Sequence, residues 1–205
     1  MSKRILLLIS FVSLFVLPGN AQVNVVGNLS ELLPAECVTQ EQVFPILNQI
    51  FGGCVDDPTA TGEMIAEAFI ENDLLPANFT YDADACVTKG FLSQILYRAL
   101  NLRPNFGEWL RIVTTGLDPD TALNIAQRYC VMVLGTADDL LTGREFVACV
   151  IATIQMELKS ERLCCGRFRY HFGELRNLLL QLLSTVMSEA EVATYIPCFV
   201  VVPTS

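Results

Sequence analysis

The chain has 205 residues, of which 52% are hydrophobic and 17% charged, and its formal net charge is −9. This composition excludes an intrinsically disordered chain, which combines low hydrophobicity with many charges. The acidic balance excludes a nucleic-acid-binding protein that depends on a basic surface. A single histidine excludes most histidine-based metal sites and leaves one candidate for histidine-based catalysis.

The first 21 residues have the three-part pattern of a secretory signal peptide. Lys3 and Arg4 precede an uncharged apolar run, Ile5–Leu17, and the small residues Gly19 and Ala21 stand before the expected cleavage site. An N-terminal membrane anchor is the alternative, but this run is shorter than the roughly 20 residues that a spanning helix needs. We therefore expect residues 1–21 to be removed. Residues 22–205 should form a single all-helical, disulfide-rich domain that is secreted, extracellular and not membrane-spanning.

Eight cysteines follow the expected signal peptide, an even number that is typical of disulfides formed in the oxidising secretory pathway. The chain has no C-x-x-C motif and a single histidine, so we expect no metal ion. It has neither a P-loop nor a G-x-G-x-x-G motif, so we expect no cofactor. Asn-x-Ser/Thr motifs at Asn28 and Asn78 predict glycosylation at the surface. The cysteines expected to form disulfides are Cys37, Cys54, Cys86, Cys130, Cys149, Cys164, Cys165 and Cys198.

Apolar residues recur at helical spacing along the chain, whereas strand-type alternation occurs only near residues 23–26 and 199–202. The expected fold class is all-α: a compact, disulfide-stapled bundle of about seven to eight helices. Pro45 has no N–H to donate and should kink or truncate the first of them. The expected helices span residues 40–52, 60–73, 83–101, 106–115, 119–134, 144–159, 168–187 and 189–196. One of the stripes that predict them, at i, i+3, i+4 and i+7, consists of Phe106, Trp109, Leu110 and Val113.

Capping signals support several of these boundaries. Asn105, Thr142 and Ser188 each precede a glutamate by three residues, which is the spacing of a capping box. Asp118 precedes a proline, which places an N-cap before a proline at the first helical position. Gly135 stands where the helix that follows Asp118 is expected to end.

Two triplets of cysteines share nearly the same spacing, 17 and 32 residues in the first and 16 and 33 in the second. The residues between them hardly match when the triplets are aligned, so we interpret the spacing as chance and not as an internal repeat. The triplets are Cys37, Cys54 and Cys86, and Cys149, Cys165 and Cys198.

No catalytic motif accompanies the single histidine. His171 would have to serve as the base of a serine hydrolase, but no G-x-S-x-G is present to supply the nucleophile. Pairs of acidic residues, such as those at Asp118 and Asp138, could serve a glycosidase. Most of them stand at expected helix starts, where carboxylates cap free N–H groups, so capping is the better interpretation. We therefore expect a non-enzymatic protein without catalytic residues.

Charge is distributed unevenly along the chain. Residues 22–88 contain 11 acidic residues and no Lys or Arg, whereas residues 89–205 contain 11 of each sign. One interpretation is the solvation of exposed helix faces. The other is a homo-oligomer in which the acidic N-terminal part meets the basic segment Lys159–Arg176 of another copy, a contact that salt would weaken.

An excess of apolar residues is the remaining signal. The helix expected over 168–187 has leucines on more than one side, which is typical of a central buried helix, a cavity wall or a partner interface. Our leading hypothesis is a secreted protein that binds an apolar small molecule or lipid inside the bundle. By helical phase, the residues expected to line that cavity are Phe91, Ile95, Phe146, Ile154, Leu179 and Leu183.

Two further functions fit the same sequence. The uneven charge and the presence of only three lysines suit an extracellular structural or self-assembling protein, such as a silk, egg-coat, foam or matrix component. An exported effector that binds a partner protein is the other. A closed apolar cavity of about 300 Å³ or more would favour the carrier. A filled core with an exposed apolar face would favour assembly.

Overall fold

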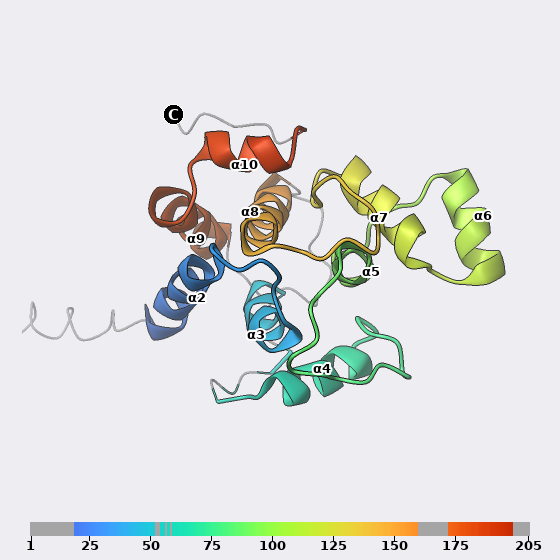
Figure 1. The fold of residues 1–205 in the computed structure, drawn as a ribbon, viewed down its shortest axis with the longest axis horizontal. Coiled ribbons are helices and arrows are strands. Elements are labelled where there is room, and N and C mark those ends of the chain that lie inside the picture. The colour runs from blue at the N-terminus through green and yellow to red at the C-terminus, as the bar shows by residue number, and fades with distance from the viewer. Residues whose placement is uncertain (1–18, 52–53, 56, 58, 160–171, 199–205) are drawn as a thin grey trace, which may run out of the picture.

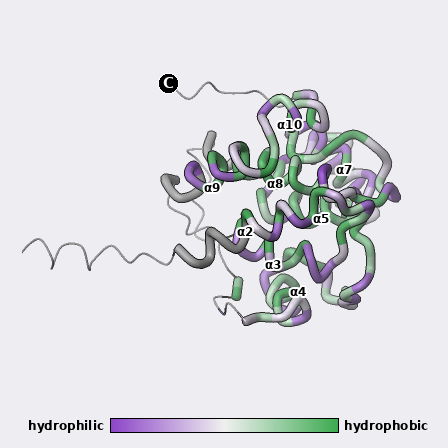
Figure 2. Tube along the Cα trace, turned by 60° about the vertical axis from the view of Figure 1, so that its left-hand side comes forward, coloured by the Kyte–Doolittle hydropathy of each residue, from purple (hydrophilic) through white to green (hydrophobic). Residues whose placement is uncertain are grey.

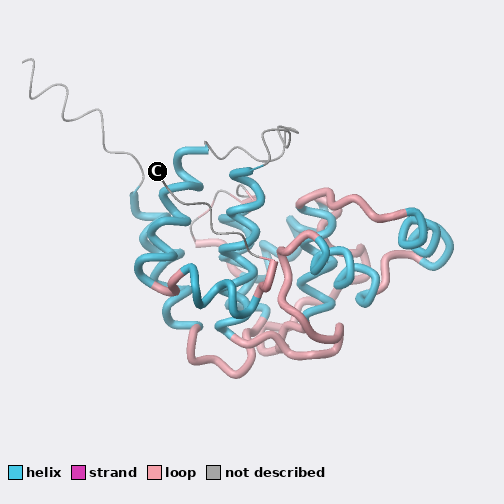
Figure 3. Tube along the Cα trace, turned by 90° about the horizontal axis from the view of Figure 1, so that it is seen from above, coloured by secondary structure: helices cyan, strands magenta, loops and turns pink. Residues whose placement is uncertain are grey.

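The computed structural model describes residues 19–51, 54–55, 57, 59–159 and 172–198. These residues form nine helices joined by loops, with no strand among them (Figure 3), so the expected all-α class is confirmed. None of the helices in these ranges is both long and apolar enough to cross a bilayer. In chain order they are α2 (Gly19–Leu32), α3 (Gln40–Ile50), α4 (Gly62–Glu71), α5 (Lys89–Ala99), α6 (Phe106–Thr115), α7 (Pro119–Arg128), α8 (Gly143–Lys159), α9 (Phe172–Thr185) and α10 (Glu189–Tyr195).

Three short segments, one before each of α3, α5 and α8, are joined by a closed ring of backbone hydrogen bonds. The Val38 N–H donates to the Leu141 carbonyl at 2.9 Å, and the Leu141 N–H donates to the Val87 carbonyl at 2.9 Å. The Val87 N–H closes the ring by donating to the Val38 carbonyl at 2.8 Å. All three residues are buried, so their polar backbone groups need partners inside the protein. The ring supplies those partners and fixes the three helix starts relative to one another.

A second set of bonds surrounds the ring. The first N–H groups of a helix have no partner within the helix itself. Here the first residue of each of α3, α5 and α8 donates its N–H to the segment before another of the three helices. These bonds run from Gln40 to Ala85 at 3.0 Å, from Lys89 to Asp139 at 2.9 Å and from Gly143 to Ala35 at 3.0 Å.

A threonine follows each residue of the ring and precedes each of the three helices. Thr88 Oγ1 accepts a hydrogen bond from the Phe91 N–H at 3.2 Å, and Thr142 Oγ1 accepts one from the Glu145 N–H at 3.3 Å. Thr39 is the equivalent residue before α3. The predicted capping box at Thr142 is confirmed, as are those at Asn105 and Ser188 and the Asp118 cap.

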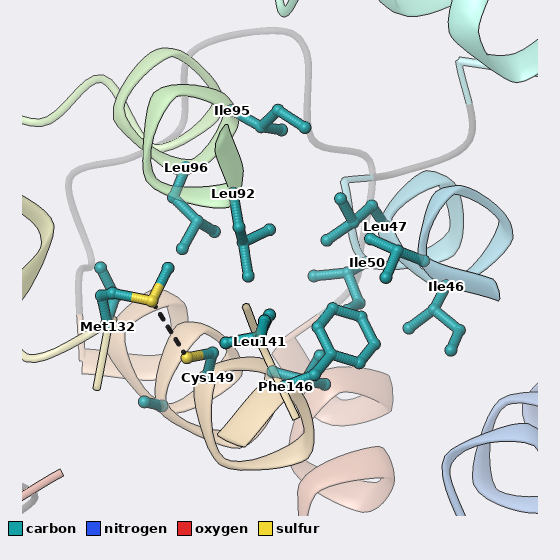
Figure 4. Close-up of a cluster of buried hydrophobic side chains, with 14 of the residues drawn as sticks. Ile46, Leu47, Ile50, Leu92, Ile95, Leu96, Met132, Leu141, Phe146 and Cys149 are labelled. Atoms are coloured by element: carbon teal, nitrogen blue, oxygen red, sulfur yellow. Dashed lines mark hydrogen bonds between the residues drawn. The ribbon is translucent and has the colours of Figure 1, made fainter. Parts of the chain in front are cut away.

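Helices α3, α5 and α8 surround a common core, and Figure 1 looks nearly along their axes. Counted from the preceding threonine, the residues at positions +4, +7 and +8 of each helix are buried. Side chains from the three helices point toward one another in Figure 4. The nine residues are Val43, Ile46 and Leu47 of α3, Leu92, Ile95 and Leu96 of α5, and Phe146, Cys149 and Val150 of α8. The chain therefore contains three similar segments, which the cysteine spacing did not indicate.

A second helix packs against each of these three: α4 against α3, α7 against α5 and α9 against α8. Helix α2 packs against α3, α8 and α9, and α10 packs against α8. Hydrophobic and hydrophilic stretches alternate along the helices in Figure 2, as expected for amphipathic helices around a shared core. Helix α6 differs, because it is inserted between α5 and α7 and projects to the far right in Figures 1 and 3.

Lys89, the first residue of α5, is buried although it is charged. Its Nζ lies 3.0 Å from Glu145 Oε1 and 3.6 Å from Asp139 Oδ2, and it donates to the Leu134 carbonyl at 2.9 Å. A buried ammonium group is tolerated only when it is paired and hydrogen-bonded. Lys89 therefore links the start of α5 to the start of α8.

Two helices are shorter than their periodicity predicts. The helix expected over 83–101 begins only at Lys89, because the residues before it pair with neighbouring segments in and around the ring. The helix expected over 119–134 ends at Arg128, close to Cys130, which has a φ of 60° and is bonded to Cys198. Gly135 therefore lies in the following loop and does not end the helix.

One local expectation is wrong, and another is wrong in one of its two alternatives. Residues 23–26, where the sequence alternates as in a strand, belong to helix α2. Helix α3 runs through Pro45 to Ile50, so the proline does not truncate it. Residues 199–202 and the part of the expected helix 168–187 before Phe172 lie outside the described residues.

The central helix is α8, not the leucine-rich α9. In α9, Leu179 and Leu182 are buried, but Arg176 and Gln181 are exposed. In α8, every residue from Phe146 to Ile154 is buried. An unbroken apolar stretch was therefore a better sign of a central helix than leucine content.

Disulfide bonds are confirmed for four of the eight cysteines, in the pairs Cys37–Cys86 and Cys130–Cys198. The first pair joins two of the three segments next to the ring. Cys164 and Cys165 lie outside the described residues, so the pairing of the other four cysteines stays a prediction.

Cys149 is fully buried in the core, with its Sγ 3.5 Å from Met132 Sδ (Figure 4). Burial raises the pKa of the Cys149 thiol to about 12. Among the described residues this thiol has no disulfide partner.

Substitution of Gly143 tests the close approach between the start of α8 and the end of α2. A Cβ at Gly143 would overlap the Leu32 carbonyl oxygen, which is backbone and cannot move without shifting α2 or α8. We expect Gly143→Ala to lower the free energy of unfolding in urea, followed by circular dichroism, by about 2–4 kcal/mol. Gly107→Ala is the matched control, because its Cβ would meet only Asn105 Oδ1 at 3.5 Å. That variant should be unchanged or up to about 1 kcal/mol more stable. Equal effects of the two substitutions would contradict the close approach at Gly143.

Candidate functional site

The six residues expected to line a ligand cavity take part in ordinary core packing. Ile95, Phe146 and Ile154 are inaccessible to solvent, and Leu179 is buried. Phe91 and Leu183 are half-buried and pack against the same core. The small space between α3, α5 and α8 that Phe146 lines does not have room for a water molecule. The core between these three helices is therefore filled.

Phe91 belongs to a cluster of aromatic rings on one side of α3. Its ring stacks on Phe79 with centroids 5.4 Å apart and lies 6.3 Å from the ring of Phe44. Phe44 also contacts Phe69 edge to face at 5.7 Å. Such aromatic pairs stabilise a core beyond the area that they bury. Packing accounts for the position of Phe91 without a ligand.

Acidic residues from several of the closely spaced pairs in the sequence have local structural roles. Asp118 caps α7 by accepting a hydrogen bond from the Thr121 N–H at 2.9 Å. Asp139 accepts hydrogen bonds from the N–H and hydroxyl of Thr136 in the loop before α8. Asp82 accepts a hydrogen bond from the Asp84 N–H at 3.2 Å. No group of three metal-ligating side chains occurs among the residues that the structure describes. His171 lies outside them.

The surface features predicted from sequence are partly in view. Asn28 and Asn78 are both exposed, as a glycosylation site requires. Glutamates 63, 67 and 71 are exposed along α4 and form part of the acidic surface. In the basic segment Lys159–Arg176, only Arg176 has a described side chain, and it is exposed.

Helix α6 has no buried residue and turns its apolar stripe to solvent. We call the four residues of that stripe the α6 face. Phe106 is 77% exposed, Val113 is 63% exposed, and Trp109 and Leu110 are each 49% exposed. The rings of Phe106 and Trp109 stack on each other with centroids 6.0 Å apart. An amphipathic helix in a globular protein normally turns this stripe toward the core, so α6 is oriented the other way.

The polar side of α6 faces the body of the protein. Arg128 Nη1 contacts both carboxylate oxygens of Glu108, at 2.9 and 2.8 Å, and Arg128 Nη2 donates to the Arg103 carbonyl at 2.9 Å. The Tyr129 hydroxyl donates to the same carbonyl at 3.2 Å. Glu108 also closes the capping box with Asn105. These bonds hold the first turn of α6 against the end of α7.

A second ion pair holds the other end of α6. Arg111 Nε lies 3.0 Å from Asp118 Oδ2, and Asp118 also caps α7. The chain between them turns at Gly116, which has a φ of 85°, and the Leu117 carbonyl accepts a hydrogen bond from Gln94 of α5. Both charged residues of α6 are thus paired on the side away from the α6 face. The face itself contains no charged residue.

The sequence identified the stripe of α6 as evidence of a helix but not as a site. Periodicity locates an apolar stripe without stating which side of the molecule it faces. The sequence signal that could have indicated the orientation of α6 lies on the opposite side of the helix from the stripe. Glu108 and Arg111 lie there, and the next helix carries Arg128 and Asp118 as partners of opposite charge.

The chain matches no family model, no curated protein and no solved structure.

The Asp118 carboxylate pairs with Arg111 of α6, so we expect protonation of Asp118 in acid to weaken the contact that orients α6. Burial tends to raise the pKa of this carboxyl, but the hydrogen bonds from Thr121 and the charge of Arg111 outweigh burial and hold it below its usual range. A depressed pKa stabilises the folded state above the unfolded-state pKa of about 3.9, and that contribution is lost as pH falls through the folded pKa.

We therefore expect Asp118→Asn, which keeps an acceptor for the cap, to lower the free energy of unfolding by about 0.5–1 kcal/mol at pH 7. The difference from the unmodified protein should shrink between pH 5 and pH 2.5, measured by urea unfolding. Hydrogen exchange of α6 amides should be faster in the variant at pH 7. A difference in stability that is constant with pH would rule out the charge of Asp118 as its cause.

Proposed function

We propose that this is a secreted, non-enzymatic protein that acts by binding a macromolecular partner through the α6 face. The observation that carries the proposal is the reversed orientation of α6, whose charged side is held to the body while its apolar side faces water. Of the functions that fit the sequence, this is assembly or binding to a partner protein, and not the carriage of an apolar ligand. A filled core between α3, α5 and α8 and an exposed apolar face support it.

The size of the α6 face supports this role. From its exposed fractions we estimate about 400–500 Å² of accessible apolar surface, given that one aromatic side chain covers about 150–250 Å². Contiguous apolar patches of this size on soluble proteins are often interaction sites. Spacing of i, i+3, i+4 and i+7 is also the pattern by which a helix docks on a protein partner.

Secretion is supported by features in different parts of the chain. The signal-peptide pattern occupies residues 1–21, and the disulfides Cys37–Cys86 and Cys130–Cys198 suit an oxidising compartment. Asn28 and Asn78 are exposed, where glycosylation would be possible. Binding to an apolar small molecule inside the bundle is the weaker proposal, because its six expected residues are occupied in packing.

Site-specific photocrosslinking tests this function. A photoreactive benzoylphenylalanine in place of Val113 should give an adduct of discrete mass when the protein is illuminated in the fluid into which it is secreted. The same group in place of Glu67, which is exposed on the acidic surface of α4, is the control and should give none. Mass spectrometry then identifies the partner, a second copy included. Adducts that are absent or equally abundant at both positions would contradict a docking role for α6.

A further inference from the structure

We propose that the occupant of the α6 face is a second copy of this chain, with the two α6 helices antiparallel across a two-fold axis. This inference rests on the function proposed above and names its partner. In a two-fold interface the same patch serves both copies, so the patch must be complementary to itself. The α6 face meets that requirement in shape and in charge.

The shape argument comes from the order of side-chain sizes along the helix. The largest side chains, Phe106 and Trp109, lie toward the N-terminal end, and the smallest, Val113, lies toward the C-terminal end. When two such helices run antiparallel, Phe106 of one copy faces Val113 of the other, and the pair at the centre is Trp109 with Leu110. Large residues then lie opposite small ones, which fills an interface without voids. A parallel arrangement would place large opposite large and leave a gap at the other end.

The charge argument concerns repulsion between two acidic molecules. Without residues 1–21, which contain Lys3 and Arg4, each copy has a net charge of −11, and residues 22–88 contain 11 acidic residues and no basic ones. Residues 101–128, which include α6, contain three arginines and three acidic residues and are neutral overall. Glu108 and Arg111 are also paired within the chain. Two copies can therefore meet at α6 with little local repulsion, while their acidic surfaces on α4 stay apart.

Other occupants fit less well. Helices that lie on membranes usually have Lys and Arg free on the polar side, whereas Arg111 is paired with Asp118 and the chain is acidic. A groove on an unrelated protein would not require the size gradient along the α6 face. These two occupants are outcomes of the experiment below.

The apolar area that the dimer would bury sets its expected dissociation constant. Two faces together bury about 900 Å², near the lower limit of specific interfaces, so we expect a reversible dimer with a dissociation constant on the order of 10–100 µM. Because the contact is apolar and both copies are acidic, added salt should strengthen it by screening the repulsion. A contact between the acidic surface and the basic segment Lys159–Arg176 would respond in the opposite way.

Sedimentation equilibrium of the mature protein from 2 to 500 µM measures the association directly. We expect the mean mass to rise from monomer toward dimer, and more steeply at 500 mM than at 50 mM NaCl. Trp109 is the only tryptophan, so its emission should move to shorter wavelength and its quenching by acrylamide should fall over the same range of concentration. Val113→Arg should weaken dimerisation at least about ten-fold, because it places a charge opposite Phe106.

Met64→Arg is the matched control, since Met64 is 45% exposed on α4 and lies outside the α6 face. It should leave the mass curve unchanged or increase association slightly by lowering the net charge. Circular dichroism of both variants checks that they fold.

Three results would overturn the second copy as occupant. The first is a monomer at every concentration, and the second is an equal loss of dimerisation in Val113→Arg and Met64→Arg. The third is a shift of Trp109 emission and a fall in its quenching that occur only when phosphatidylcholine vesicles are added, and not as the protein concentration rises. If the protein stays monomeric while Val113 still crosslinks to another protein, the proposed docking function survives and only its partner changes.

Discussion

The ring of backbone hydrogen bonds between Val38, Val87 and Leu141 is the constraint on which the rest of the fold depends. Each of these residues precedes a helix, so the ring fixes where α3, α5 and α8 begin and how they face one another. The side chains one and two turns further along then meet in a core that excludes water. Thr39, Thr88 and Thr142 connect the two features, because each follows a ring residue and immediately precedes a helix. Disulfide Cys37–Cys86 and the buried Lys89 reinforce the ring from its margins.

This arrangement also explains how one helix can turn its apolar side outward. The core is formed by α3, α5 and α8 together with the helices that pack against them, and α6, which is inserted between α5 and α7, contributes no buried residue to it. Helix α6 is held by the half-buried Ile112, which packs against the core, and by two ion pairs, Glu108 with Arg128 and Arg111 with Asp118. Surface ion pairs of this kind contribute little to stability individually, but they are directional. They set the orientation of α6, while the core determines whether the protein folds.

The sequence predicted the helical class and most helix positions because amphipathic periodicity and capping boxes are local signals. Asn105, Asp118, Thr142 and Ser188 all cap helices as expected. The ring was not predicted, because it joins segments that are about 50 residues apart through backbone groups that every residue possesses. The pattern that accompanies the ring in the sequence is short and common. It consists of an apolar residue, a threonine, and apolar residues four, seven and eight positions after that threonine. The outward orientation of α6 depended on pairings between neighbouring helices, which periodicity does not contain.

The ring has a consequence for the biogenesis of the protein. Its members span Val38 to Leu141, so a chain that is synthesised N-terminus first cannot close the ring until about two thirds of it has been made. Until then the backbone groups around Val38 and Val87 lack their final partners and are open to pairing with other chains. Cys37 and Cys86 both emerge before the last segment, and their disulfide can hold two thirds of the ring in register while the ribosome supplies the remainder. Oxidation of this pair during synthesis would therefore favour the native pairing of the first two segments before the third is available.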